Sequence, residues 1–313
     1  MSFPLSTFYL YLCIRKRQKM IEYIDFGTWI RKQLNARVQK IAVDAGFTCP
    51  NRDGKVGFGG CSFCNNKTFN PSYCDNRKSI SEQLEDGKKF FSRKYPDMKY
   101  IAYFQAFSNT YAPLERLKRL YEEALSVDGV IGLSIATRPD CLDTTTLDYL
   151  SELSRRTFLI LEIGIESAND ATLRLINRGH NFECSKKAIT EANRRGIITC
   201  GHIIFGLPGE DENEILSQAE TISSLPLDIL KIHQLQIVKG TKMADDYKEK
   251  PFRTFSVDEY IDLIINYISR LRKDLVLERF VSQSPKKMVI APKWGLKNQE
   301  FTELFLQKMK ERE

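Results

Sequence analysis

The sequence has 313 residues, of which 42% are hydrophobic and 28% are charged. This composition provides enough apolar side chains for one large buried core and excludes a low-complexity chain, and no internal repeat indicates a solenoid. The formal net charge of +7 excludes neither a nucleic-acid substrate nor a small-molecule substrate.

The first part of the chain carries an apolar stretch, residues 3–14, followed by three basic residues, 15–17. A signal peptide carries its positive charge before the apolar stretch, and a membrane span needs about 20 apolar residues. We therefore expect that translation naturally begins at Met20 and that residues 1–19 are an over-extended gene start; a membrane anchor is the less favoured alternative. Residues 1–19 contribute four positive charges and no acidic residue, which leaves +3 for residues 20–313.

Apolar segments of strand length alternate with longer segments of helical periodicity. Six strands are predicted, over residues 38–43, 100–107, 130–136, 158–165, 197–205 and 229–236. Five helices are predicted between them, over residues 79–95, 113–126, 144–155, 182–195 and 212–224. This order predicts parallel strands with right-handed crossovers, and six units are too few for a closed eight-stranded barrel. The fold class is therefore α/β: a partial (β/α)6 TIM-like barrel of parallel strands, with a doubly wound sheet as the alternative.

The pattern changes after the sixth strand. Residues 240–251 are rich in charge and are predicted to form a loop. A helix over residues 256–272, a strand over 275–281 and a final helix over 299–310 follow. We interpret residues 20–240 as the core and residues 241–313 as a small C-terminal extension packed on it.

The fourth predicted strand separates polar from apolar side chains. Successive residues of a strand point to opposite faces, so Leu159, Leu161, Ile163 and Ile165 share one apolar face that suits covering helices. Residues 162, 164 and 166 (Glu, Gly and Glu) share the other face, which would point into the barrel. Sites in such barrels lie at the carboxyl ends of the strands, and the strand-end glutamate, residue 166, is the better functional candidate.

The strongest local signal follows the first predicted strand, in residues 47–66. Cys49, Cys61 and Cys64 have the spacing C-x11-C-x2-C, and four glycines between the first two allow a tight wrap. Three thiolates can hold a four-iron four-sulfur cluster and leave one iron without a protein ligand. That iron can bind the amino and carboxylate groups of S-adenosylmethionine (SAM), whose reductive cleavage yields a carbon radical.

Other chemistries fit the same spacing. Structural zinc needs four ligands, and Cys74 could complete a four-cysteine site. A C-x2-C pair can also act as a redox dithiol. Eight cysteines without an export signal favour metal or redox chemistry in the reducing cytoplasm over a disulfide framework.

Beyond the cysteine loop, several motifs recur at predicted strand ends in the order of a known family. They are residues 103–111 (YFQAFSNTY), 136–140 (ATRPD), 162–167 (EIGIES), 177–180 (NRGH), 201–210 (GHIIFGLPGE) and 231–236 (KIHQLQ). With these motifs the sequence resembles radical SAM enzymes, in particular the YtqA/YhcC-like group, which is related to the Elongator catalytic subunit and to oxygen-independent coproporphyrinogen oxidase. The resemblance covers roughly residues 20–295.

The resemblance implies a set of site residues. The cluster ligands would be Cys49, Cys61 and Cys64, and Cys74 and Cys141 would be small structural residues. Cofactor contacts would come from Phe63, Ser108, Asn109, Arg138, Glu166, Ser167, Ile204, Gly206 and His233. The carboxylates expected to take part in the chemistry are Glu162, Asp140 and Glu210.

The resemblance also implies partners. The related groups act on tRNA or tetrapyrroles, and for this branch it suggests the tRNA wobble uridine, whose 5-carboxymethylaminomethyl side chain would be processed towards 5-aminomethyl. An electron donor such as flavodoxin or ferredoxin would be needed, and no membrane would take part in the reaction. Two alternatives stay open: a radical SAM enzyme acting on a small molecule or peptide, and a zinc-stabilised RNA-binding protein.

Overall fold

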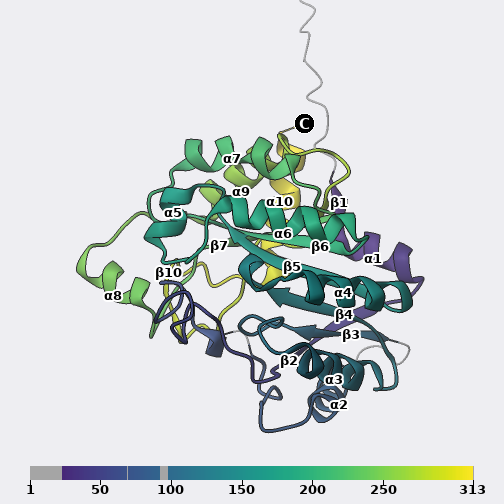
Figure 1. Cartoon of the computed structure of the whole chain (residues 1–313). Coiled ribbons are helices and arrows are strands. Elements are labelled where there is room, and N and C mark those ends of the chain that lie inside the picture. The colour runs from purple at the N-terminus through teal and green to yellow at the C-terminus, as the bar shows by residue number, and fades with distance from the viewer. Residues whose placement is uncertain (1–22, 69, 92–97, 313) are drawn as a thin grey trace, which may run out of the picture.

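The computed structural model describes residues 23–68, 70–91 and 98–312 (Figure 1). The expected over-extended start, residues 1–19, lies outside the described residues. Within the described ranges, no helix is both long and apolar enough to cross a membrane.

Six parallel strands form the centre of the sheet, as the sequence predicts. Each pairs in parallel with the next along the chain, for example Val38 opposite Lys99 and Gly132 opposite Phe158, with one register shift in the β3–β4 pair and one in the β5–β6 pair. The strands are β2 (Val38–Val43), β3 (Lys99–Phe104), β4 (Val130–Thr137), β5 (Phe158–Glu166), β6 (Ile198–Phe205) and β7 (Ile229–Gln234).

Two short parallel strands extend the sheet beyond the six predicted. β9 (Val276–Leu277) pairs with β7, and β1 (Ile24–Asp25) pairs with β9. The order is β1-β9-β7-β6-β5-β4-β3-β2, so the sheet curls into a half-barrel whose edges are β1 and β2. The prediction of an α/β partial TIM-like barrel is confirmed. The predicted strand over residues 275–281 is shorter, because only two of its residues pair.

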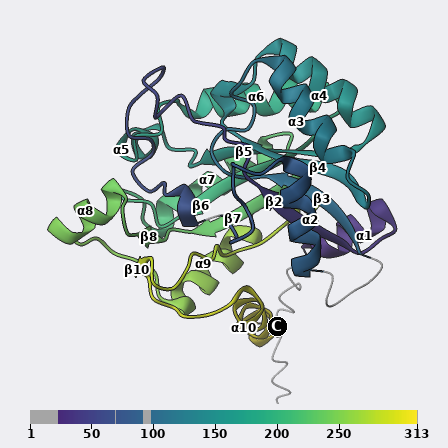
Figure 2. The ribbon, with the colours of Figure 1, turned by 90° about the horizontal axis from the view of Figure 1, so that it is seen from below.

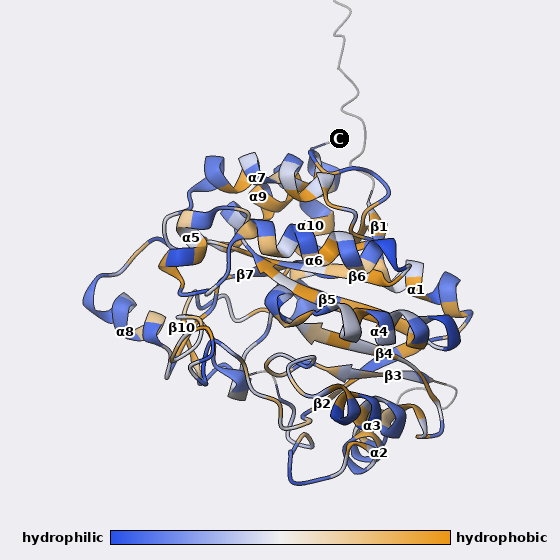
Figure 3. Ribbon diagram, viewed as in Figure 1, coloured by the Kyte–Doolittle hydropathy of each residue, from blue (hydrophilic) through white to orange (hydrophobic). Residues whose placement is uncertain are grey.

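Helices cover the outer face of the sheet (Figure 1). α1 (Phe26–Leu34) and α5 (Asp170–Leu175) are not among them, because α1 packs on the inward-facing Ile160 and Cys200 and α5 packs beside Leu207. The covering helices are α2 (Ile80–Phe91), α3 (Leu114–Leu125), α4 (Thr144–Arg156), α6 (Phe182–Arg194) and α7 (Glu212–Ser224). Their apolar faces pack on strand residues such as Leu161 and Ile163, both fully buried, which confirms the outer face predicted for β5. Figure 3 shows hydrophilic residues on the outward turns of α4 and α7.

The segment after β7 contains one helix that the sequence analysis interpreted as a loop. Residues 240–251 contain α8 (Lys242–Glu249). The loop prediction was wrong because Thr241 caps the helix, its Oγ1 accepting from the Ala244 N–H at 3.1 Å. Met243 and Ala244 are also buried in a small apolar cluster with Leu207. The charged residues that suggested a loop include Asp245 and Lys248 on the exposed side.

The rest of the C-terminal part packs against the barrel and its helices (Figure 2). α9 (Val257–Ile268) and α10 (Asn298–Glu311) bury apolar residues in the main core, among them Phe301 and Phe305. The short antiparallel pair of β8 (Ile237–Val238) and β10 (Val289–Ala291) lies near α8.

Candidate active site

The loop between β2 and α2 brings three cysteine side chains to one cavity. Cys49, Cys61 and Cys64 all line a cavity of about 170 Å³ at the carboxyl ends of the strands. The loop folds back through the N–H groups of Arg52 and Gly60, which donate to the carbonyls of Cys49 and Asn51 at 2.8 Å. Gly60 has φ +84°, and a Cβ there would lie 2.9 Å from Nε of Arg52, so glycine permits the tight wrap that the sequence predicts.

The segment between β5 and α6 holds this loop in place. Asn51 is fully buried, and its Nδ2 donates to the Asn177 carbonyl at 2.6 Å. The Asn177 amide donates to the Gly60 carbonyl at 2.8 Å. Arg178 donates to the Gly164 carbonyl at 2.7 Å and forms an ion pair with Glu166 at 3.2 Å. The run NRGH therefore connects the cysteine loop to the end of β5.

N–H groups surround the sulfur atoms. Arg178 Nη1 lies 3.4 Å from Cys61 Sγ, and Asn66 Nδ2 lies 3.5 Å from Cys64 Sγ. Burial raises the pKa of Cys64 to about 11, and burial also raises the pKa of Cys49. A thiol with a raised pKa, as at Cys49 and Cys64, must lose its proton when it binds a metal ion. Buried sulfur ligands with N–H donors and nearby guanidinium groups fit an iron–sulfur cluster.

The fourth cysteine of the zinc alternative points elsewhere. Cys74 Sγ donates to the Ala42 carbonyl at 2.9 Å, and its side chain packs against the main apolar core. Among the described residues, no three histidine, cysteine or acidic side chains are close enough together to hold one metal ion. Cys74 does not line the cavity of the other three cysteines, so it does not complete the four-cysteine set that the zinc alternative needs.

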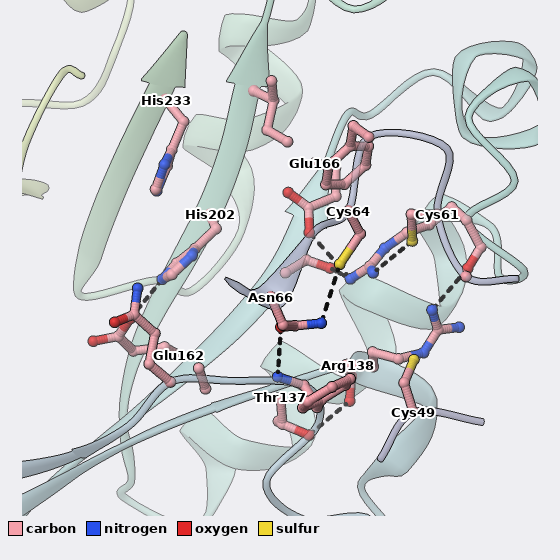
Figure 4. A pocket seen from close by; sticks show the side chains of 18 of the residues that line it. Cys49, Cys61, Cys64, Asn66, Thr137, Arg138, Glu162, Glu166, His202 and His233 are labelled. Atoms are coloured by element: carbon pink, nitrogen blue, oxygen red, sulfur yellow. Dashed lines mark hydrogen bonds and ion pairs between the residues drawn. The ribbon is translucent and has the colours of Figure 1, made fainter. Parts of the chain in front are cut away.

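Several of the predicted cofactor contacts line the same cavity. These are Phe63, Arg138, Glu166, Ile204 and His233. Asp140 holds Arg138 through two hydrogen bonds of 2.8 and 2.7 Å, which explains the threonine-arginine-proline-aspartate motif at the end of β4. Burial lowers the pKa of Arg138, but the ion pair with Asp140 raises the pKa by a larger amount. The net shift is upward, and the guanidinium stays charged. Figure 4 shows Arg138 and Glu166 near the cysteines.

Other predicted residues lie behind the cavity wall. Ser108 bonds to Thr137 Oγ1 at 2.9 Å, and the Asn109 amide donates to the carbonyls of Phe104 and Ala136. Ser167 bonds to Glu210, and burial raises the pKa of Glu210. Glu210 and Gly206 line a different depression, together with Phe255 and residues 207–217. The structure does not bring these five predicted residues into the cavity of the cysteines.

Glu162 lies on the side of the cavity opposite the cysteines (Figure 4). It is fully buried and accepts from five groups, which are Lys40, Lys231, Tyr103, His202 and Ser134. Burial alone would raise the pKa of Glu162, but Lys231, Lys40 and His202 together lower it well below its usual value. A carboxylate with so many donors keeps its charge and cannot readily take a proton.

The network around Glu162 extends through residues that the sequence analysis did not select. Glu278 bridges Lys40 at 2.9 Å and Lys231 at 3.0 Å. Arg178 was also missed as a site residue, although it stands in a motif that the sequence analysis quoted. Lys40 could have been found as the charged residue within the first predicted strand.

The fold and this cavity define a half-barrel enzyme with a three-cysteine loop at its mouth. A sequence model of the radical SAM superfamily matches residues 49–222, more than half of the chain, and a model of the radical SAM C-terminal domain matches residues 227–311. The chain therefore belongs to the radical SAM superfamily. Its members use a four-iron four-sulfur cluster and SAM, and the chain is a radical SAM enzyme.

Several known proteins are similar to this chain in sequence. YtqA of Bacillus subtilis is 38% identical over 88% of this chain and 85% of its own length. YhcC of Escherichia coli is 34% identical over 88% of each chain. A tRNA uridine(34) acetyltransferase of Methanocaldococcus infernus is 24% identical over 63% of this chain and 38% of its own length.

One solved structure is similar over most of the fold. The Elongator protein 3 of Methanocaldococcus infernus has a TM-score of 0.67 at 18% identity and covers 88% of this chain. This chain spans 63% of that structure, so the similarity shows the fold of the shared part.

Proposed function

We propose that Cys49, Cys61 and Cys64 hold the four-iron four-sulfur cluster, and that the enzyme modifies the side chain of the tRNA wobble uridine. The observation that carries the first part is the convergence of three cysteine side chains, all from the same loop, on one cavity at the barrel mouth. When bound, the cluster and SAM supply a carbon radical that abstracts hydrogen from an unactivated position.

The chain's own residues have separate tasks in this proposal. Phe63 and Ile204 provide apolar walls that exclude water, while Arg138 and Glu166 are placed to contact polar groups of SAM. Arg178 stabilises the anionic cluster through its N–H contact with Cys61. Asp140 and Glu162 act as positioning residues, because each holds cationic partners in the cavity wall. A small electron-transfer protein of the flavodoxin or ferredoxin class would supply the electron.

Three observations support the wobble uridine as substrate. A relative over 63% of this chain is named for tRNA uridine 34. Residues 20–313 carry a mild positive charge, which suits a polyanion. The step from 5-carboxymethylaminomethyl to 5-aminomethyl uridine involves a C–H bond beside an amine, and an anticodon base can be flipped into a barrel mouth.

Deletion of the gene is expected to make 5-carboxymethylaminomethyl uridine accumulate in tRNA at the expense of the 5-aminomethyl form. Nucleoside mass spectrometry of total tRNA measures both. A plasmid copy of the gene should restore the normal ratio, and a copy with Cys61→Ala should not. An unchanged nucleoside profile in the deletion strain contradicts the tRNA substrate and favours a small molecule or a peptide.

A further inference from the structure

One of the arginines that line the cavity has no side-chain partner among the described residues. Arg138 is paired with Asp140, Arg178 with Glu166, and Arg52 donates to the Cys64 carbonyl at 3.0 Å. Arg279 also lines the cavity, but its side chain makes no hydrogen bond or ion pair with any described residue. Its Nε is buried and unsatisfied. An N–H group buried without an acceptor is costly, and a half-buried guanidinium of this kind at a cavity suits an anionic ligand.

The position of Arg279 separates it from the cysteine side of the cavity. It lies two residues after the end of β9, and it lines both the cavity of the cysteines and a neighbouring cavity that contains Lys40, Lys231 and Glu278. His233 lines the first cavity and is seen in Figure 4 on the side of Glu162 and His202, away from the cysteines. The ligand of Arg279 therefore belongs to the inner, substrate side of the barrel.

Two further polar side chains line the cavity together with Arg279, and one of them has a buried atom without a partner among the described residues. His233 Nε2 is buried and has no partner among the described residues. The amide of Gln105 lines both cavities and makes no hydrogen bond to any residue that the structure describes. Arg279, Gln105 and His233 therefore present a guanidinium, an amide and an imidazole as hydrogen-bonding groups to the same cavity. A carboxylate with an adjacent amine could use such a set, since guanidinium binds carboxylate through two parallel hydrogen bonds.

The charge balance of the inner side favours a single negative charge. Lys40 and Lys231 are matched by Glu162 and Glu278. Burial and nearby cations lower the pKa of His233 well below its usual value, so this imidazole adds no charge. Arg279 is left as one unbalanced positive charge. One carboxylate neutralises it, whereas a phosphate dianion would leave an excess negative charge in a buried space.

We propose that Arg279 binds a carboxylate on the group of the substrate that enters the barrel and selects substrates that carry one. This assignment rests on the proposed function, in which the carboxymethyl end of the uridine side chain supplies the carboxylate. Gln105 and His233 then contact the polar atoms beside it. Arg279 thereby orients the side chain with its reacting carbon towards the cysteine side of the cavity.

The test compares two anticodon stem-loops, one with 5-carboxymethylaminomethyl uridine and one with its methyl ester. Their dissociation constants are measured by calorimetry with the anaerobic, cluster-loaded enzyme in the presence of SAM. The wild type is expected to prefer the acid by about 10- to 100-fold. R279Q should reduce this preference below about threefold, and R279K should retain part of it. R119Q, which changes an exposed arginine on α3, is the matched control and should keep the full preference.

The outcomes separate the two proposals. A wild type without acid preference, an R279Q variant that keeps it, or an R279Q variant that loses affinity for SAM instead each overturns the assignment of Arg279. The cluster content and the circular dichroism of R279Q test whether this variant is folded. If R279Q is not folded, the acid preference is measured with R279K instead. If the wild type prefers the acid through Arg279 but leaves the stem-loop chemically unchanged, the wobble-uridine reaction fails while the carboxylate site stands.

Discussion

Single alanine substitutions of Cys49, Cys61 and Cys64 are expected to reduce the iron and sulfide content of the reconstituted protein to background and to lower SAM cleavage by more than about 100-fold. All three sulfurs line one cavity and come from one loop, so the loss of any of them leaves an incomplete ligand set. Iron and sulfide assays, with the optical spectrum of anaerobic protein, measure the first effect. Chromatographic detection of 5′-deoxyadenosine measures the second.

Cys74→Ala provides the matched control for these variants. Its thiol donates to the Ala42 carbonyl away from the cavity, so the variant should keep its cluster and its SAM cleavage. If Cys74→Ala loses the cluster as completely as Cys61→Ala does, the proposed ligand set is incorrect and Cys74 is a ligand.

The second large effect is expected from Glu162→Gln, which should lower the free energy of unfolding by about 3–5 kcal/mol. The substitution removes the negative charge shared by Lys40 and Lys231 and leaves Glu278 alone to balance two cations that are almost entirely removed from water. Urea denaturation of the cluster-free protein at neutral pH measures the loss.

The pH dependence of stability provides a further check of the same network. Because the folded pKa of Glu162 is depressed, its contribution is complete above the ordinary glutamate pKa and is lost only as the pH falls towards the lower folded value. With Glu162→Gln, the free energy of unfolding should therefore depend less on pH in the acidic range. Glu122→Gln, which breaks an exposed ion pair with Arg156, should change stability much less. Equal effects of the two substitutions would contradict a structural role for the buried charges.

The strands of the core were predictable because their apolar segments are short, regular and separated by helical patterns. β2 and α7 have the predicted bounds, and the other strands differ by one to three residues at their ends. The edge strand β1 was not predicted, because two residues carry no periodic signal, and β9 is only part of the strand predicted over residues 275–281. α8 was missed because its capping residue and two buried residues stand among many charges.

The site was predictable where residues adjacent in sequence act together. The spacing of the three cysteines and the inward face of β5 both led to residues that line the cavity. The charge network was not accessible in the same way. Lys40 contacts Glu162 and Glu278 across 122 and 238 positions of sequence, so only the folded, curled sheet brings them together.

The motif after β3 illustrates a different limit. Ser108 and Asn109 were expected to contact the cofactor from their place in the chain, yet their side chains bond to β4 and to the end of β3. A motif position identifies a neighbourhood, while hydrogen-bond partners decide which way a short polar side chain points. Thr137 and Asn66, rather than Ser108 and Asn109, line the cavity near the ends of β3 and β4.

The most direct test of the central claim is the anaerobic reaction of the reconstituted wild-type protein with SAM and a strong reductant. We expect about four iron and four sulfide per chain, together with 5′-deoxyadenosine and methionine formed only when both the reductant and the cluster are present. A protein that binds one zinc, holds no sulfide and leaves SAM intact would contradict the assignment of Cys49, Cys61 and Cys64 as ligands of a cluster with an open iron.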